Sequence, residues 1–175
     1  MKIYLVRHGE VISNALKHYN EDSDDLTELG IKQAEELREK IKTIEIDAIF
    51  CSTLLRAKHT ASIINENHKP IIYDDRIKER NVGDLAGRPL TVTNRDEYWN
   101  YNTSLQYGTS ENIKLFFKRV YQFLEELKNQ PYECILIVAH SGVSKAFSAY
   151  FEGIQDGMFL NRGLKNCEMK EYDLK

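Results

Sequence analysis

The chain has 175 residues, of which 42% are hydrophobic and 29% are charged, and its formal net charge at pH 7 is −3. This length and composition are typical of one globular domain. The slight acidic excess argues against a general nucleic-acid-binding protein, which would carry a basic face, but it allows a local positive pocket. The sequence contains neither a stretch of about 18 apolar residues nor a signal-peptide pattern, so we expect a cytoplasmic protein without a membrane partner.

The first expected strand, at about residues 2–7, is apolar and runs directly into Arg7-His8-Gly9. Asn14 follows a few residues later. A helix is expected at about 28–43, because apolar residues there recur at steps of three and four. A cation, an imidazole and a flexible backbone point at the end of a buried strand are typical of a ligand site in an open α/β sheet.

The second strand is expected at about 46–51, followed by a helix over about 54–65 that carries Arg56 in its first turns. A short strand is expected at about 70–73. Residues 88–110 form the least regular stretch and contain Tyr98, Trp99, Tyr101 and Tyr107. These aromatic side chains either shape a substrate pocket or pack onto the main core as part of a surface excursion.

The clearest helix is expected at about 113–127, with Asn112 as its N-cap. The strand at about 133–139 then ends on His140-Ser141-Gly142, in the same way that the first strand ends on His8. A further helix is expected over about 143–151. The free N–H groups at its start favour an anion.

A last strand is expected at about 167–173. Strands that alternate with helices predict the α/β class, here a three-layer α/β/α sandwich with a mostly parallel central sheet. No repeat or linker is visible, so we expect a single domain over 1–175. The carboxyl ends of parallel strands share one edge, which predicts one anion pocket around His8 and His140.

Five ordered blocks of the sequence resemble the motifs of the histidine phosphatase superfamily, also called the phosphoglycerate mutase-like family. They are Arg7-His8-Gly9 with Asn14, Leu26–Ala34, Ser52–Ala61, Glu79–Gly87 and Val138–Gly142. The resemblance implies a phosphoglycerate mutase-like fold and a substrate-shaping insertion at about 88–110. It also implies a hydrolase, a metal-independent phosphatase of the histidine acid phosphatase type that passes through a phosphohistidine.

The residue types fit that chemistry. An imidazole with a pKa near about 6.5 offers an uncharged nitrogen at neutral pH, which makes His8 the expected nucleophile, and Gly9 could offer its carbonyl to the other ring nitrogen. Arg7 and Arg56 are the expected phosphate clamp, because a guanidinium grips phosphate oxygens in a forked manner. The resemblance implies that His140 faces the phosphate.

The remaining roles are those of hydrogen-bond donors and of the acid. The resemblance implies that Asn14 donates a hydrogen bond to the substrate, and Ser141 is expected to bind substrate at the helix start. Glu79 matches the acid of the family, which protonates the leaving group and then activates water. Glu10 and Asp84 are rival candidates for that role. Since several positive groups already surround the pocket and no carboxylate cluster would hold magnesium, we expect no metal and no cofactor.

Several observations bear on the choice of function. The chain is short, has Asn81-Val82 where the mutase subgroup has an aromatic residue, and lacks an evident arginine pair in the insertion. A phosphatase acting on a small phosphorylated molecule is therefore favoured over the two alternatives. These are a phosphoglycerate mutase on the same scaffold and a non-catalytic module that binds phosphorylated ligands. The substrate and the oligomeric state stay open. His18, His59 and His68 are expected at the surface.

Overall fold

The computed structural model describes residues 1–103 and 105–175. Residue 104, which falls within the predicted insertion at 88–110, lies outside the described residues. The strands are β1 (Lys2–Arg7), β2 (Ala48–Cys51), β3 (Ile71–Tyr73), β4 (Cys134–Ala139) and β5 (Met169–Asp173). The α-helices are α1 (Ile12–Ala15), α2 (Glu28–Ile41), α3 (Leu55–Ile64), α4 (Arg95–Tyr98), α5 (Ile113–Leu127) and α6 (Ser141–Glu152).

The strands form one sheet in the order β3-β2-β4-β1-β5. Strands β1 to β4 are parallel to their neighbours, and β5 pairs antiparallel with β1 at the edge. In the central pair Arg7 is opposite Ala139, and between β2 and β4 Cys51 is opposite Val138. This register brings the residues that follow β1, β2 and β4 together at one edge of the sheet.

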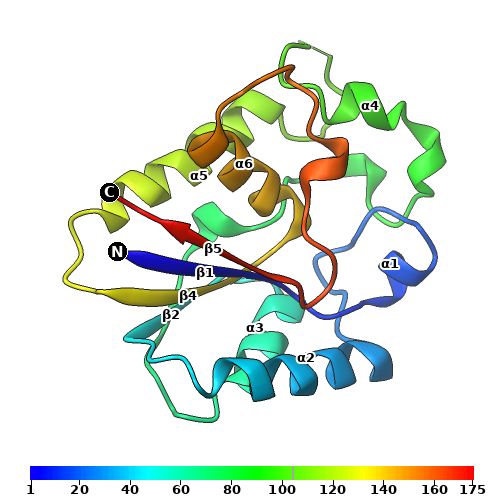
Figure 1. The fold of residues 1–175 in the computed structure, drawn as a ribbon. Coiled ribbons are helices and arrows are strands. Elements are labelled where there is room, and N and C mark those ends of the chain that lie inside the picture. Colours follow the sequence, from blue (N-terminus) through cyan, green and yellow to red (C-terminus); the bar gives the residue numbers. More distant parts are fainter. Residues whose placement is uncertain (104) are drawn as a thin grey trace.

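Helices cover both faces of the sheet, with α5 and α6 on one side and α2 and α3 on the other (Figure 1). Successive strand residues point to opposite faces, so the sheet contributes alternately to two cores. Ile135 and Ile137 pack with α5 and α6, whereas Leu136 and Val138 pack with α2 and α3. The predicted three-layer α/β/α sandwich with a mostly parallel sheet is confirmed.

The long helices follow the sequence pattern closely. In α5 the predicted apolar face, from Ile113 to Leu127, is buried, and Asn112 caps the helix by accepting a hydrogen bond from the N–H of Lys114 at 2.9 Å. Helix α6 begins at Ser141 rather than at Val143. The short helices α1 and α4 have four residues each, too few to produce a detectable apolar period.

None of the helices in the described residues is both long and apolar enough to cross a bilayer.

Candidate active site

Two imidazoles lie side by side just beyond the ends of β1 and β4. The backbone N–H of His8 donates to the carbonyl oxygen of Ala139 at 3.0 Å, which continues the parallel ladder past the strands. The rings of His8 and His140 are consequently adjacent, with centroids 5.1 Å apart. Both residues are buried, with exposed fractions of 1% and 0%. The two histidines thus meet at one edge of the sheet, as the strand pattern predicts.

Hydrogen bonds determine which nitrogen of each ring is engaged. Nδ1 of His8 lies 2.7 Å from the carbonyl oxygen of Gly9. Because a carbonyl can only accept, Nδ1 carries the proton of the neutral ring and Nε2 keeps its lone pair. In His140, Nε2 lies 2.7 Å from the hydroxyl of Ser52, and the buried Nδ1 has no partner among the described residues.

The surroundings of the two rings favour their neutral forms. Burial and the positive charges of Arg56 and Arg7 lower the pKa of His8 well below the ordinary value of histidine. Burial, Arg56 and the neighbouring His8 lower the pKa of His140 in the same way. The site therefore presents an unprotonated nitrogen at neutral pH. A bound phosphate dianion would act in the opposite direction and favour the charged imidazolium.

The loop that carries His8 is held against the start of α2. A Cβ on Gly9 would collide with the carbonyl oxygen of Gly30, and a Cβ on Gly30 would collide with that of Glu10. The N–H of Gly9 donates to the hydroxyl of Thr60 at 3.1 Å, and the N–H of Glu10 to the side chain of Gln33 at 2.9 Å. The motif around Thr27–Gln33 is thus a helix start and packing surface for the His8 loop.

Two arginines bring positive charge to the same edge. Arg7 is the last residue of β1, and Arg56 lies in the first turn of α3. Each donates one hydrogen bond of 2.9 Å to a backbone carbonyl, Arg7 to Leu164 and Arg56 to Glu21. The Nε atoms of both are buried without a partner in the described part of the chain. Burial lowers the pKa of both guanidiniums, so an anion placed between them would relieve an uncompensated charge.

Glu79 reaches the start of α6 from the loop after β3. Its Oε1 accepts a hydrogen bond from the N–H of Arg80 at 2.8 Å, and its Oε2 accepts one from the N–H of Gly142 at 3.0 Å. A Cβ on Gly142 would collide with Oε1, so only glycine allows the carboxylate to approach this closely. The carboxylate is thereby fixed beside the helix start that follows His140.

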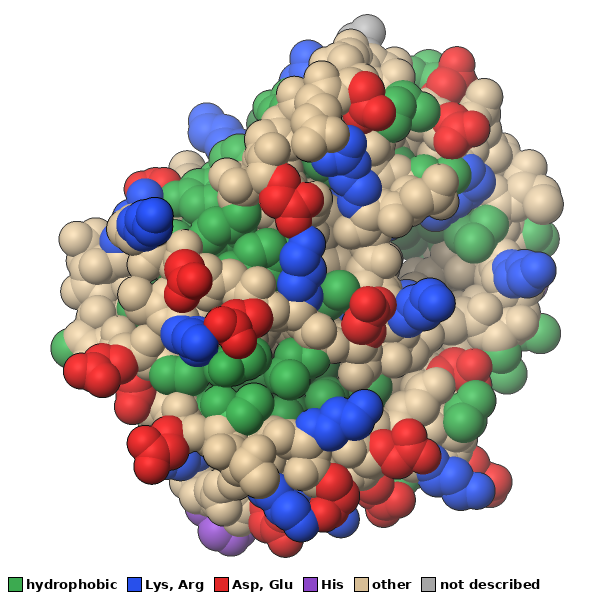
Figure 2. All heavy atoms as spheres, in the orientation of Figure 1, with side chains coloured by type: hydrophobic (Ala, Val, Ile, Leu, Met, Phe, Trp, Pro, Cys, Tyr) green, Lys and Arg blue, Asp and Glu red, His purple; other side chains and the backbone are tan. Residues whose placement is uncertain are grey.

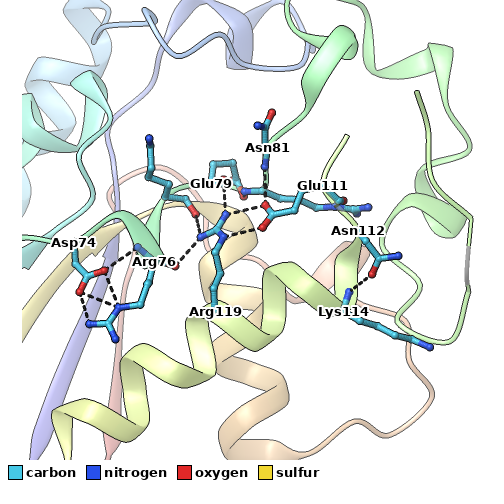
Figure 3. A network of polar contacts seen from close by, with 10 residues as sticks. Asp74, Arg76, Glu79, Asn81, Glu111, Asn112, Lys114 and Arg119 are labelled. Carbon is cyan, nitrogen blue, oxygen red and sulfur yellow. Dashed lines mark hydrogen bonds and ion pairs between the residues drawn. The ribbon is translucent and has the colours of Figure 1, made fainter. Parts of the chain in front are cut away.

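A second arginine network holds the backbone of the Glu79 segment (Figure 3). Arg119 of α5 binds both carboxylate oxygens of Glu111, at 2.8 and 2.9 Å. The same guanidinium donates to the carbonyl oxygens of Arg76, Lys78 and Glu79 at 2.6, 2.9 and 2.9 Å. Arg119 therefore ties α5 to the loop that presents Glu79. The sequence analysis did not single out this residue.

A cleft of about 580 Å³ opens beside this edge of the sheet. Figure 2 shows a hollow on the side of the molecule where α1 and α4 lie, with Lys and Arg side chains close to it. The predicted site residues in its lining are Arg7, Asn14, Arg56, Glu79 and Ser141. The described residues that line the cleft do not include the rival acids Glu10 and Asp84. His8 and His140 are buried behind the lining surface.

The rival acids are engaged elsewhere. Glu10 accepts a hydrogen bond from the hydroxyl of Thr27 at 3.0 Å, and Asp84 accepts one from the N–H of Thr109 at 3.1 Å. Among the three histidines expected at the surface, His68 is exposed, whereas His59 is half-buried and pairs with Asp25 at 2.8 Å. His18 is half-buried and lines the cleft. The short helix α1, which the sequence pattern does not predict, brings it there.

The aromatic residues of the irregular stretch pack onto the core, and two of them also reach the cleft. Tyr98 and Trp99 are 2% and 5% exposed and belong to the core that packs under α5, yet both also line the cleft. Tyr101 and Tyr107 are half-buried and pack against the same core. The guanidinium of Arg80 lies 4.0 Å from the centre of the Tyr98 ring. Because Arg80 directly follows Glu79, this contact connects the irregular stretch to the segment that carries Glu79.

Lys145 of α6 also lines the cleft, and the sequence analysis did not single it out. It is only 4% exposed, and burial lowers the pKa of its amine to about 8. The signal was present in the sequence, because this lysine stands among Gly142, Val143, Ala146 and Phe147 in a helix with little polar surface. A lysine in such a helix is placed either at the surface or in a polar pocket, and only the structure decides between them.

The chain belongs to the histidine phosphatase superfamily, branch 1, whose family model matches residues 3–175. A phosphatase from Bacillus subtilis, PhoE, is 34% identical over 177 residues, which cover 97% of this chain and 89% of that protein. A Yersinia pestis protein named for phosphoglycerate mutase, GpmB, is 28% identical over 99% of this chain and 85% of its own length. The crystal structure of the α-ribazole phosphatase from Shigella flexneri has a TM-score of 0.86 at 27% identity, covering 99% of this chain and 90% of that one.

Proposed function

We propose that this protein is a metal-independent phosphatase that hydrolyses small phosphomonoesters through a phosphohistidine on His8. One observation carries the proposal. Around the buried His8, three further nitrogen atoms, Nε of Arg7, Nε of Arg56 and Nδ1 of His140, are buried without a partner in the described residues. Unsatisfied buried donors are costly, and a tetrahedral anion supplies the acceptors that all three would need.

The reaction proceeds in two displacements. Nε2 of His8 attacks phosphorus, the bond from phosphorus to the ester oxygen breaks, and the Glu79 carboxyl gives its proton to the leaving alkoxide. Water then attacks the phosphohistidine, the P–N bond breaks, and Glu79 takes the proton back. Arg7, Arg56 and His140 stabilise the charge of the transferring group. We expect the two arginine side chains to move toward the phosphate and open the path to His8.

The lining of the cleft supports the remaining roles. Asn14 accepts a hydrogen bond from Asn166 at 3.1 Å and contributes to the rim. We propose that it donates to a phosphate oxygen, that Ser141 binds substrate at the start of α6, and that residues 88–110 shape the pocket. Relatives named for phosphatases and for phosphoglycerate mutase both occur. A mutase must retain its intermediate and exclude water, and a short insertion such as residues 88–110 is poorly suited to either task. We therefore favour the phosphatase.

The test is a panel of phosphomonoesters, including sugar phosphates, phosphoglycerates and nucleotides, incubated with purified protein. We expect phosphate release that His8→Ala abolishes and that EDTA leaves unchanged. Interconversion of phosphoglycerates without phosphate release would establish the mutase instead. Release of phosphate from none of the esters would favour a binding module, and loss of activity in EDTA with recovery on a divalent ion would refute metal independence.

A further inference from the structure

A short turn before β5 lies against the loop that follows β1. The backbone N–H of Cys167 donates to the carbonyl oxygen of Arg7 at 3.0 Å, and the guanidinium of Arg7 donates to the carbonyl oxygen of Leu164 at 2.9 Å. The backbone N–H of Arg7 donates to the carbonyl oxygen of Glu168 at 3.2 Å. These contacts extend the antiparallel pairing of β1 with β5 past its last pair of residues, so residues 164–168 are held directly against the proposed site.

The backbone of this turn is unusual at Cys167, whose φ of 53° lies in the left-handed region that residues other than glycine seldom adopt. Such a conformation persists where the surrounding contacts fix it. Here the N–H of Cys167 is held by the carbonyl oxygens of Arg7 and His8, at 3.0 and 3.3 Å. Asn166 directly precedes Cys167, and its side chain contacts the same loop.

The amide of Asn166 connects two segments of the site. Its Nδ2 donates one hydrogen bond to the carbonyl oxygen of His8 and another to Oδ1 of Asn14, both at 3.1 Å. Because a carbonyl oxygen can only accept, the contact with His8 requires the NH2 end of the Asn166 amide at this place. The second N–H of that group then requires the oxygen of the Asn14 amide opposite it. The backbone of His8 therefore determines the orientation of both amides.

The orientation of Asn14 matters because its amide has one donating and one accepting end. Its Oδ1 accepts from Asn166 at 3.1 Å and from the backbone N–H of Val11 at a longer 3.4 Å. Its Nδ2 consequently faces the other way, where it lies 3.5 Å from Oδ1 of Asn20. Asn14 and Asn20 both line the cleft, whereas Asn166 is not among the described residues that line it. The NH2 of Asn14 thus lies on the cleft side, and Asn166 acts from behind it.

We propose that Asn166 is a positioning residue of the phosphatase, which holds the Asn14 amide with its NH2 turned toward the bound phosphate. The inference rests on the proposed function, in which Asn14 donates to a phosphate oxygen, and adds the residue that orients this donor. If the Asn14 amide turned over, its oxygen would face the phosphate dianion and repel it. A donor that is oriented before the substrate binds needs no reorganisation during the reaction.

A double-mutant cycle on Asn14 and Asn166 tests this role, with the Kd of inorganic phosphate measured by calorimetry. Asn14→Ala should weaken phosphate binding by about 10- to 100-fold, as the loss of one hydrogen bond to a charged group predicts. Asn166→Leu keeps the approximate shape of the side chain without its NH2 and should weaken binding by about 5- to 20-fold, since the donor is no longer held. In the Asn14→Ala protein the same substitution should change the Kd by less than about twofold, because no amide is left to orient.

The matched control is Glu168→Ala. It removes the carboxylate that accepts from the N–H of Lys165 at 2.6 Å in the same turn, and it leaves the Asn14 amide untouched. Its effect on the Kd of phosphate should be small and the same with or without Asn14. Equal weakening by Asn166→Leu in the parent and in Asn14→Ala would overturn the inference, because Asn166 would then support only the turn. Parent-like phosphate affinity in Asn14→Ala would overturn it as well.

NMR of the parent protein keeps the inference testable if Asn166→Leu does not fold. During titration with inorganic phosphate the side-chain NH2 signals of Asn14 should shift, whereas those of Asn166 should stay in place and exchange slowly with water throughout. Fast exchange of the Asn166 signals, or Asn14 signals that do not respond to phosphate, would refute the positioning role. Hydrolysis of p-nitrophenyl phosphate that His8→Ala abolishes would still support the phosphatase in that case. Failure to hydrolyse this or any other ester would instead defeat the proposed function itself.

Discussion

The proposed reaction asks one carboxyl group, Glu79, to act in both displacements. As an acid it protonates the leaving alkoxide, and as a base it removes a proton from water. Its two oxygens are held by backbone N–H groups of Arg80 and Gly142, which fix the carboxyl beside the start of α6. At the scale of single residues, the substitution of this carboxyl separates binding from turnover.

Glu79→Gln should bind phosphate as well as the parent protein does and hydrolyse alkyl phosphates at least about 100-fold more slowly, which is the usual contribution of general acid–base catalysis. With p-nitrophenyl phosphate the leaving group needs no proton, so the first step should stay fast. Stopped-flow absorbance should then show a burst of nitrophenolate equal to the enzyme concentration, followed by slow turnover.

The matched control is Glu10→Gln, which removes a carboxyl next to His8 in the sequence. Because Glu10 bonds the hydroxyl of Thr27 outside the cleft lining, we expect turnover within a few-fold of the parent rate. Parent-like hydrolysis by Glu79→Gln together with a large loss in Glu10→Gln would reverse the assignment of the acid.

At the scale of elements, the site depends on how loops are fastened to helices. Arg119 donates to three backbone carbonyls of the loop that presents Glu79, and it forms an ion pair with Glu111. The side chains of Arg119 and Glu111 are 22% and 18% exposed, which protects this ion pair from solvent. The loop that presents Glu79 is therefore rigid because α5 supplies its hydrogen-bond donors.

Arg119→Met should lower kcat by about tenfold with little change in phosphate affinity, since a misplaced acid affects the transition state more than the bound anion. The free energy of unfolding should fall by about 1–3 kcal/mol, because three partly buried carbonyls lose their donor. Urea denaturation and steady-state kinetics measure both effects.

Glu111→Gln serves as the comparison, because it leaves Arg119 bonded to the backbone carbonyls. Glu111→Gln should lower kcat and the free energy of unfolding by less than Arg119→Met does. A parent-like kcat in Arg119→Met would show that this network supports the fold without positioning Glu79.

The sequence predicts the elements that carry the site better than it predicts the contacts between them. The ends of β1 and β4, the capped α5 and the placement of Arg56 on α3 all follow from periodicity and from motifs. Lys145 and Arg119 could not be found in this way, because their burial depends on loops that are distant in sequence. Gly163 makes room for the amine of Lys145, and Arg119 binds three of its four partner residues through backbone carbonyls, which carry no sequence signal.

At the scale of the whole molecule, the fold buries positive and titratable groups that the unfolded chain exposes. The pKa values of His8 and His140 are lowered by burial and by the neighbouring arginines, so the native state keeps both imidazoles neutral. In the unfolded chain they take up protons as the pH falls through about 6.5. Their contribution to stability is therefore complete above that pH and is lost progressively below it.

We accordingly expect the free energy of unfolding to fall between pH 7.5 and 5.5, with about 1.4 kcal/mol contributed by each imidazole. Few carboxyl groups titrate in this window, so the change reports mainly on histidine. Replacing both residues with glutamine should flatten the dependence in urea denaturation. Inorganic phosphate should stabilise the parent protein, because the anion binds only the native site. Parallel pH profiles in parent and double variant would contradict the neutral, buried state of the two rings.

The covalent intermediate is the most direct test of the account. Protein mixed with a ³²P-labelled phosphomonoester and quenched rapidly in alkali should carry a label that is stable in base and lost in acid, and peptide mass spectrometry should place it on His8. In Glu79→Gln with ³²P-labelled p-nitrophenyl phosphate, whose leaving group needs no proton, the labelled fraction should rise, because only the water step is slowed. Phosphate release with no such label at any quench time, or a label on another residue, would contradict the mechanism.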